Sequence, residues 1–396
     1  MLKKRKKIGL VLANTPEYSE TFFKSKIKGL VEAGNEVVLF APVSNDFDKG
    51  EYADVNVVEP YRVFSNTLLQ AFVTIGVVSS LIFRHPVRSA RLVSLERRSG
   101  NDIGSALKTL YLNAHILPHS LDWLHFGFAT MGLGRENVGR AIGAKVAVSF
   151  RGYDISIYPL KHPGCYDRLF KAIDKVHSIS DDLYSQAVSL GLSPDISYQK
   201  ITPAIDCSRF KKVHRTDGNI NDPLRIVSVG RLTWKKGFDY ALQALSALKK
   251  DFHYTIIGQG NDLERLSYSA YQLGILDKVT FAGKRTPAEI SEMLQSCDIY
   301  LQPSVQEGFC NSVLEAQACG TICIVSDAEG LPENVENGKS GFVVAKRDPQ
   351  AIVDTIIKVC QMTPDDRKQM RDYATERIAL QFDVRDQINA FVKFYQ

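Results

Sequence analysis

Residues 224–237, LRIVSVGRLTWKKG, hold the pattern that decides the fold. Their apolar first half ends in a glycine turn that carries Arg231 and Lys236, and a helical pattern follows at 238–250. A strand, a glycine turn and a helix in this order form the first half of a βαβ unit. The preceding residues, 211–223, are polar, rich in Gly, Asn and Asp, and lack periodicity. We therefore predict a linker there, with a second domain beginning after it.

The same alternation of short apolar runs and helical patterns extends over the whole chain, and it indicates parallel sheets built from βαβ units. Strands are predicted at 8–13, 36–41, 146–150, 176–179, 225–229, 253–257, 278–282, 298–301 and 322–325. Helices are predicted at 21–34, 238–250, 262–273, 287–296 and 312–319. The expected fold class is α/β, with two doubly wound, Rossmann-like domains at 1–210 and 220–375 that face each other across a cleft.

Composition and charge narrow the class of protein. The chain has 396 residues, 44% hydrophobic and 23% charged, which is ordinary globular composition and enough length for two cores. Its seven cysteines contain no C-x-x-C pair, which argues against a disulfide framework or a zinc cage and favours a reducing cytosol. The net charge of +5 comes from residues 1–210, with 26 Lys/Arg against 20 Asp/Glu, whereas residues 211–396 have 23 against 24.

The basic clusters of the first half flank apolar sequence and have no interleaved aromatic residues, so we expect an anionic membrane surface as a partner rather than nucleic acid. The longest apolar stretch is 68–83, LLQAFVTIGVVSSLIF. It is shorter than the roughly 20 residues of a spanning helix. Two interpretations stay open: a helix packed on its domain, or a monotopic membrane-docking helix whose following arginines, Arg84, Arg88 and Arg91, bind phospholipid.

Residues 303–316, PSVQEGFCNSVLEA, are the most informative stretch for chemistry. A strand ends near Leu301 and a helix starts around Ser312, so the amide groups at the helix start form an anion site. Glu307 lies in the loop, where we expect no structural partner and therefore a functional role. For Glu315 a second interpretation stays open, because Ser312-x-x-Glu315 has the form of a capping box.

Two glycine turns add candidate sites. Arg231 and Lys236 in the first turn offer two cations and backbone donors to a diphosphate, although a solvated basic loop would look the same. Gly258-Gln259-Gly260 is half of the dinucleotide fingerprint, with Leu263 in place of the third glycine. This argues against a nicotinamide or flavin site and leaves a tight turn near a nucleoside.

These residues carry a family resemblance. Glu307 and Glu315, in E-G-F-x-N-x-x-x-E-A, resemble the two-glutamate motif of retaining GT-B glycosyltransferases of family 4. The glycine turns at 230–237 and 258–260, then 281–284 and 332–335, follow in that family's order over the whole second half. In the first half, three segments are similar to members of that family that build bacterial exopolysaccharide, capsule or lipopolysaccharide. These segments are Ser19-Glu20-Thr21-Phe22, His125-Phe126-Gly127 and Ser149-Phe150-Arg151-Gly152-Tyr153-Asp154.

The resemblance implies roles for the residues of the second domain, as the nucleotide-sugar-binding domain. Arg231 and Lys236 would neutralise the donor diphosphate as the leaving group, Glu307 would hold hydroxyls of the donor sugar, and Glu315 would accept from the ribose. No metal or other cofactor would be required. The amides that would also contact the diphosphate belong to Gly308, Phe309, Asn311, Ser312 and Val313. The groups that would flank the base are the backbone near Gly260 and the side chains of Lys284 or Arg285.

In the first domain, 1–210, the resemblance implies acceptor binding by Ser19, Glu20, Arg151 and Asp154. Where many relatives have histidine before Gly-Tyr-Asp, this chain has Arg151, which has too high a pKa to act as a base and is expected to bind phosphate or an anionic acceptor. His125 becomes the candidate on the acceptor side, with a hydrogen-bonded core histidine as the equal alternative. The last segment, 376–396, would form a helix that crosses back to the first domain.

The expected function is a glycosyltransferase that moves a sugar from a nucleotide-diphosphate donor, with a UDP-sugar favoured, to a glycan or lipid-linked acceptor in cell-surface polysaccharide synthesis. The expected location is the cytoplasm, as a peripheral protein on the inner face of the membrane. The alternatives are a sugar-nucleotide 2-epimerase on the same fold and a non-catalytic sugar-nucleotide-binding module.

Overall fold

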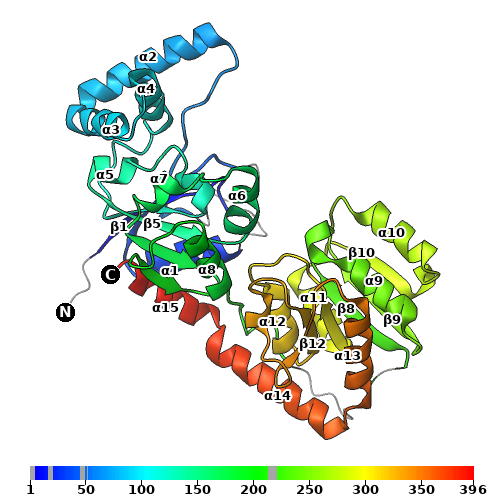
Figure 1. Ribbon diagram of the computed structural model, residues 1–396. Helices are drawn as coiled ribbons and strands as arrows, with labels where there is room; N and C mark the ends of the chain where they lie inside the picture. The colour runs from blue at the N-terminus through cyan, green and yellow to red at the C-terminus, as the bar shows by residue number, and fades with distance from the viewer. Residues whose placement is uncertain (1–4, 17–20, 45–49, 51, 213–219, 221) are drawn as a thin grey trace. The chain divides into compact units, whose positions relative to one another are not determined.

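The computed structural model describes all residues except 1–4, 17–20, 45–49, 51, 213–219 and 221 (Figure 1). The chain forms two compact units: Met1–Ile201 together with Ile388–Gln396, and Thr202–Gln387. Each unit is built on one parallel sheet with helices between its strands. The expected α/β class with two Rossmann-like sheets is confirmed. The linker predicted at 211–223 lies mostly outside the described residues.

Within the described residues, the first unit has a seven-stranded sheet in the order β3-β2-β1-β4-β5-β6-β7. Strand β1 is central: Ile8 pairs with Val37 of β2 on one side and with Trp123 of β4 on the other. The strands are β1 (Lys7–Val11), β2 (Glu36–Phe40), β3 (Asn56–Val58), β4 (Trp123–Phe126), β5 (Lys145–Phe150), β6 (Lys175–Ser178) and β7 (Ser197–Lys200). The helices are α1 (Thr21–Glu32), α2 (Thr67–Arg84), α3 (Pro86–Arg98), α4 (Ile103–Leu112), α5 (Val138–Ile142), α6 (Tyr158–Lys161), α7 (Asp167–Phe170) and α8 (Asp181–Ser189).

Three strands of this sheet are missing from the sequence prediction, namely β3, β4 and β7. The predicted strands β1, β2 and β5 are continuous apolar runs because both of their faces are buried. Strand β4 is only four residues long and includes a histidine, and the same is true of β6, which is among the predicted strands, so these two features alone do not explain why β4 is missing from the prediction. The edge strand β7, Ser-Tyr-Gln-Lys, is polar and partly exposed, so it has no apolar run to detect.

Helices α2, α3 and α4 form an insertion between β3 and β4, and they pack on one another at one end of the first unit (Figure 1). Helix α2 covers the apolar stretch 68–83, and Val78 and Leu81 are its buried side chains. Most of its other apolar side chains are exposed, including Phe72 and Phe83. Helix α2 thus packs on α3 and α4 through one side, as the packed-helix interpretation expects, but leaves most of its apolar side chains exposed, and the membrane-docking interpretation stays a prediction. Within the described residues, α2 is the one helix long and apolar enough to cross a membrane.

The C-terminal residues complete the core of the first unit. Helix α15 (Val384–Phe394) begins in the second unit, and its last residues belong to the first. Phe391, Phe394 and Tyr395 are at most 1% exposed and pack in the core that also contains Trp123. The Trp123 indole donates to the Tyr395 carbonyl oxygen at 3.1 Å. The first sheet thus depends on residues that follow the whole of the second unit in the sequence.

The second unit has a six-stranded parallel sheet in the order β10-β9-β8-β11-β12-β13 within the described residues. Its strands are β8 (Leu224–Val229), β9 (Phe252–Ile257), β10 (Val279–Gly283), β11 (Ile299–Gln302), β12 (Ile322–Ser326) and β13 (Gly341–Val344). Its helices are α9 (Phe238–Ala247), α10 (Leu263–Gln272), α11 (Pro287–Ser296), α12 (Asn311–Ala318), α13 (Pro349–Gln361) and α14 (Pro364–Gln381). The predicted helix at 287–296 has these bounds, and the predicted helices at 238–250, 262–273 and 312–319 differ by at most three residues at either end.

Candidate functional site

The candidate site lies where the sheet of the second unit changes winding direction. From β8 the chain adds β9 and β10 on one side, and from β11 it adds β12 and β13 on the other. The loops after β8 and β11, residues 230–237 and 303–310, therefore leave neighbouring strands at the same edge of the sheet. In open parallel sheets this switch point is where ligands bind.

Backbone contacts fix these two loops against each other. The Val305 amide donates to the Lys235 carbonyl oxygen at 2.7 Å. Gly237 has a φ of +64°, and a Cβ atom there would clash with the Pro303 carbonyl oxygen. Only glycine fits a left-handed conformation at such close approach. These contacts fix the positions of the side chains on one loop relative to those on the other.

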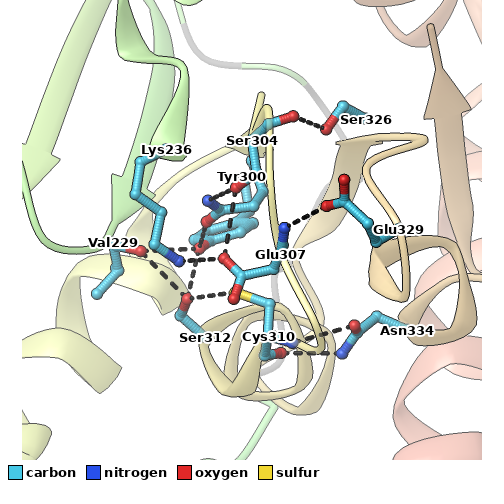
Figure 2. Close-up of polar contacts among 11 residues, drawn as sticks. Val229, Lys236, Tyr300, Ser304, Glu307, Cys310, Ser312, Ser326, Glu329 and Asn334 are labelled. Carbon is cyan, nitrogen blue, oxygen red and sulfur yellow. Dashed lines mark hydrogen bonds and ion pairs between the residues drawn. The ribbon is translucent and has the colours of Figure 1, made fainter. Parts of the chain in front are cut away.

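Lys236 and Glu307, which lie 71 residues apart in the sequence, form an ion pair across the two loops (Figure 2). Both side chains are 16% exposed. Burial lowers the pKa of Lys236, but the Glu307 carboxylate more than offsets this and leaves that pKa raised. The expectation that Glu307 lacks a structural partner is therefore wrong. The same pairing brings two predicted site residues together.

Helix α12 starts beside this ion pair, and its start is held by Asn334 (Figure 2). The Asn334 side chain donates to the Cys310 carbonyl oxygen at 2.9 Å and accepts from the Cys310 amide at 3.2 Å. Cys310 is the N-cap residue, and no side chain caps the helix. The predicted amide donors Asn311, Ser312 and Val313 form its first turn, and Gly308 and Phe309 precede it.

The capping box predicted for Ser312 and Glu315 is wrong, because Ser312 lies inside the helix. Its hydroxyl instead donates to the Val229 carbonyl oxygen at 3.2 Å and accepts from Tyr300 at 2.8 Å. The Glu315 carboxylate has no hydrogen-bond or ion-pair partner among the described residues, and burial raises its pKa to about 7. A partly buried carboxyl group without a partner at a ligand-binding edge is typical of a functional group.

The glycine turn after β9 lies next to the loop after β8. The Leu232 amide donates to the Gln259 carbonyl oxygen at 2.9 Å, and a Cβ atom at Gly260 would clash with the Leu232 carbonyl oxygen. Contact with the neighbouring loop thus explains Gly260 without a ligand. Lys284 and Arg285 follow β10 and are exposed, and Arg285 lies 4.0 Å from Glu289.

Residues 210–377 match the family model described as Glycosyl transferases group 1. The second unit is a group 1 glycosyltransferase domain. The whole chain is 27% identical to WcaL of Salmonella typhimurium, provisionally named a colanic acid biosynthesis glycosyltransferase, with 95% of this chain and 96% of that protein covered. It is 32% identical to the amylovoran biosynthesis glycosyltransferase AmsK of Erwinia amylovora over 61% of each chain. The protein is accordingly an enzyme of the glycosyltransferase class.

Solved structures agree on the fold. HepE of Anabaena in complex with UDP aligns over 98% of both chains with a TM-score of 0.73 at 16% identity. A glycosyltransferase of Rickettsia africae aligns over 99% of this chain and 98% of its own, with the same TM-score and identity. This likeness establishes the GT-B architecture of two Rossmann-like α/β sheets.

Positive charge gathers at the glycosyltransferase domain's site. Arg231 is exposed and forms no ion pair among the described residues. Burial, and then the nearby charge of Arg231, lower the pKa of Lys235. With Lys236, three cations thus lie on one loop, and the negative charges of Glu307 and Glu329 oppose them. The arrangement suits an anion that carries more than one charge.

Replacing Arg231 or Lys236 with methionine is expected to weaken nucleoside diphosphate binding about tenfold each, because each removes a charge-assisted hydrogen bond to phosphate. Isothermal titration with the nucleotide would measure the dissociation constants. Lys249, an exposed lysine on the same unit, provides the matched control when it is replaced with methionine. Equal affinities for all three variants would contradict a phosphate role for this loop.

The site residues predicted in the first unit have different outcomes in the structure. Ser19 and Glu20 lie outside the described residues. His125 is fully buried in β4, with its ring nitrogens 2.7 Å from the Ser149 hydroxyl and 2.6 Å from the Tyr395 hydroxyl. Burial and the charge of Lys26 lower its pKa well below the usual range. It is thus a hydrogen-bonded core histidine, and the catalytic interpretation is not what the structure shows.

Arg151 directly follows β5, and Asp154 lies in the short π-helix Tyr153–Ile157 that comes next. The Arg151 guanidinium stacks on Phe22, with 3.8 Å from its carbon to the ring centroid. The buried Asp154 carboxylate accepts from the amides of Arg151 and Ala129, each at 3.0 Å. These contacts join the loops after β4 and β5, which is a structural role. Whether acceptor binding is a second role stays a prediction.

Sequence reasoning missed Glu329, which supports the loop of Glu307. The Glu307 amide donates to the Glu329 carboxylate at 2.8 Å, and Glu329 itself has a φ of +40° (Figure 2). Nothing in the sequence around it marks this contact, because a single glutamate in a turn is most often exposed. Among the described residues, no group of three or more His, Cys, Asp or Glu side chains is placed to hold a metal ion.

Proposed function

We propose that the protein transfers a sugar from a nucleotide-diphosphate donor to a glycan or lipid-linked acceptor during cell-surface polysaccharide synthesis, with retention of anomeric configuration and without a metal ion. The observation that carries this proposal is the cluster at the switch point of the second unit. Cations on the loop after β8, the Glu307 carboxylate, the uncapped start of α12 and the unpartnered Glu315 all lie at that edge.

Each group has a defined part in the proposed reaction. The bond between the anomeric carbon of the sugar and the donor phosphate breaks, and that carbon forms a bond to an acceptor hydroxyl oxygen. The hydroxyl proton passes to the leaving diphosphate, on which negative charge develops. Arg231, Lys236 and the first amides of α12 offset that charge in place of a metal ion. Glu307 accepts from hydroxyls of the donor sugar, and Glu315 accepts from the ribose.

The choice of donor and acceptor has support from similar proteins. HepE of Anabaena was solved with UDP-glucose as well as UDP, which favours a UDP-sugar as donor. The full-length relative WcaL is named for colanic acid biosynthesis. A Campylobacter jejuni relative, 29% identical over 51% of this chain, is named as a transferase acting on a diphospho-undecaprenol lipid. We therefore propose a polysaccharide pathway, a lipid-linked acceptor and a location on the cytoplasmic face of the membrane.

A thermal-shift panel of UDP, GDP, ADP and dTDP tests the donor site. A nucleotide at about 100 times its dissociation constant is expected to add about 2.7 kcal/mol to the free energy of unfolding. We expect UDP to give the largest shift, and the absence of a shift with every nucleotide would overturn the proposal. Acceptor-dependent release of the nucleotide then separates a transferase from an epimerase, which releases none.

A further inference from the structure

Helix α2 presents apolar side chains on two opposite faces. Its inner face, which includes Val78 and Leu81, packs within the insertion. The outer face carries Leu68, Phe72, Ile75, Ile82 and Phe83, whose spacing of three, four and seven residues places them on one side of a helix. We name this set the outer stripe. Leu68 is 84% exposed, Phe72 78% and Phe83 88%.

A surface helix of a soluble protein normally carries polar side chains where the outer stripe is apolar. Val63, shortly before α2, and Val87, shortly after it, are also largely exposed. Several large apolar side chains exposed on one side of a helix mark an interaction site. The stripe therefore requires a partner that takes up apolar side chains.

The charge around the outer stripe selects the kind of partner. Residues 61–112 contain seven Lys/Arg and two Asp/Glu. Of the two acids, Glu96 is buried and pairs with Arg168 at 3.0 Å, and Asp102 caps α4 by accepting from the Ser105 amide. The exposed Arg84, Arg91 and Arg98 have no ion-pair partner among the described residues. Arg84 ends α2, and Arg91 and Arg98 lie on α3, which packs on α2. An apolar helix face combined with arginines on the same helix and on its neighbour is complementary to a bilayer of anionic phospholipid.

The sheet topology decides how α2 meets such a bilayer. In sequence α2 lies between β3 and β4, and these strands belong to one sheet, in which β4 pairs with β1. A single crossing by α2 would place strands of the same sheet on opposite sides of the membrane. No return crossing exists in the insertion, because α3 contains four arginines and α4 has 10 residues, about half of a spanning length.

We propose that the insertion α2–α4 docks the protein on an anionic phospholipid surface, with α2 lying in the plane of the interface and the outer stripe among the acyl chains. This inference rests on the proposed function for its purpose, which is to reach a lipid-linked acceptor. The structural observations behind the inference concern only the insertion α2–α4 and not the donor site. Membrane binding can therefore be measured without donor or acceptor.

Sedimentation of the full chain with vesicles of phosphatidylcholine, with and without phosphatidylglycerol, tests the docking. We expect binding to the mixed vesicles, weakened by salt, and little binding to phosphatidylcholine alone. The double variant Phe72→Ser/Phe83→Ser is expected to lower the vesicle partition coefficient roughly tenfold or more, since two large side chains leave the acyl region. Both residues are exposed, so the fold does not depend on them. Leu160→Ser/Leu380→Ser, at two other highly exposed apolar positions, is the matched control.

The triple variant Arg84→Gln/Arg91→Gln/Arg98→Gln tests the charge, with Lys161→Gln/Lys171→Gln/Lys249→Gln as its control at equal change in net charge. We expect only the arginine variant to lose the preference for phosphatidylglycerol. Tryptophan placed by Phe72→Trp is expected to be quenched by lipids brominated on the acyl chain.

Three outcomes would overturn the inference: equal vesicle binding by the stripe variant and its control, no quenching of the introduced tryptophan, or a dimer in solution that the stripe variant abolishes. The last result would identify a second copy as the partner. UDP-induced thermal shifts of the same variants report on the donor site separately. Vesicle binding can thus be absent while UDP still shifts the unfolding temperature, and vesicle binding can be present while UDP gives no shift. Failure of the inference and failure of the proposed function are therefore distinguishable.

Discussion

Replacing Glu307 with alanine is expected to lower kcat about 10²- to 10³-fold, the usual cost of removing one group that stabilises the reacting centre. Lys236 and the α12 amides remain, so nucleoside diphosphate binding is expected to change much less than kcat. The measurement is the rate of acceptor-dependent UDP release under saturating donor, together with the dissociation constant of UDP. Unchanged transfer by this variant would contradict the proposed role of Glu307.

Because Glu307 forms an ion pair with Lys236, a loss of activity in Glu307→Ala has a second explanation, namely a displaced Lys236 side chain, and this explanation can be tested. If Glu307 only positions Lys236, then Glu307→Ala and Lys236→Met should cost the same, and the double variant should cost no more than either. If Glu307 also contacts the donor sugar, the double variant should lose clearly more activity than Lys236→Met alone. A double-mutant cycle separates the two cases. Glu307→Gln, which keeps a hydrogen-bond acceptor, is expected to fall between wild type and Glu307→Ala.

Replacing Glu315 with glutamine is expected to raise the free energy of unfolding by up to about 3 kcal/mol at pH 8, while weakening donor binding. Burial raises the pKa of this carboxyl from 4.5 to about 7. Above pH 7 the folded protein therefore holds a partly buried, unpaired carboxylate, which lowers stability by that amount. Below pH 4.5 the group is protonated in both folded and unfolded states, and the cost disappears.

Denaturant titrations at pH 8 and pH 4.5 check this pH dependence. The stability gain of Glu315→Gln should be largest at pH 8 and should fall as the pH decreases from 7 to 4.5. Glu292→Gln, at an exposed glutamate on α11, is the matched control and is expected to change stability little at either pH. A loss of stability at pH 8 on replacing Glu315 would show that its carboxylate has a structural partner after all.

Much of the fold follows from sequence, because fully buried parallel strands leave continuous apolar runs. Two elements illustrate this, because each is predicted from a local pattern and is present in the structure. They are strand β8, which ends in a glycine turn, and helix α11, which begins at Pro287. Of the strands that escaped prediction, β3 is too short and β7 too polar to stand out. The place of β4 in the sheet depends on its pairing with β1, far away in the sequence.

The candidate site was predictable in its residues but not in its contacts. Loop position alone indicated Glu307 and Lys236, yet their pairing depends on β8 and β11 being neighbours in the sheet. The Ser312-x-x-Glu315 spacing suggested a cap with Ser312 as the N-cap residue, but the N-cap is Cys310, two residues earlier, so Ser312 lies inside the helix. For His125 the sequence left two readings, and its burial beside Tyr395 is a contact between residues 270 positions apart.

The placement of Phe391, Phe394 and Tyr395 in the first core has a consequence for synthesis. While the chain leaves the ribosome, residues 1–201 emerge first but lack three aromatic side chains that fill their sheet's interior. Residues 202–387 emerge next and can close their own core before those side chains arrive. The order of completion is thus the reverse of the order of translation, and the first unit is the last to become rigid.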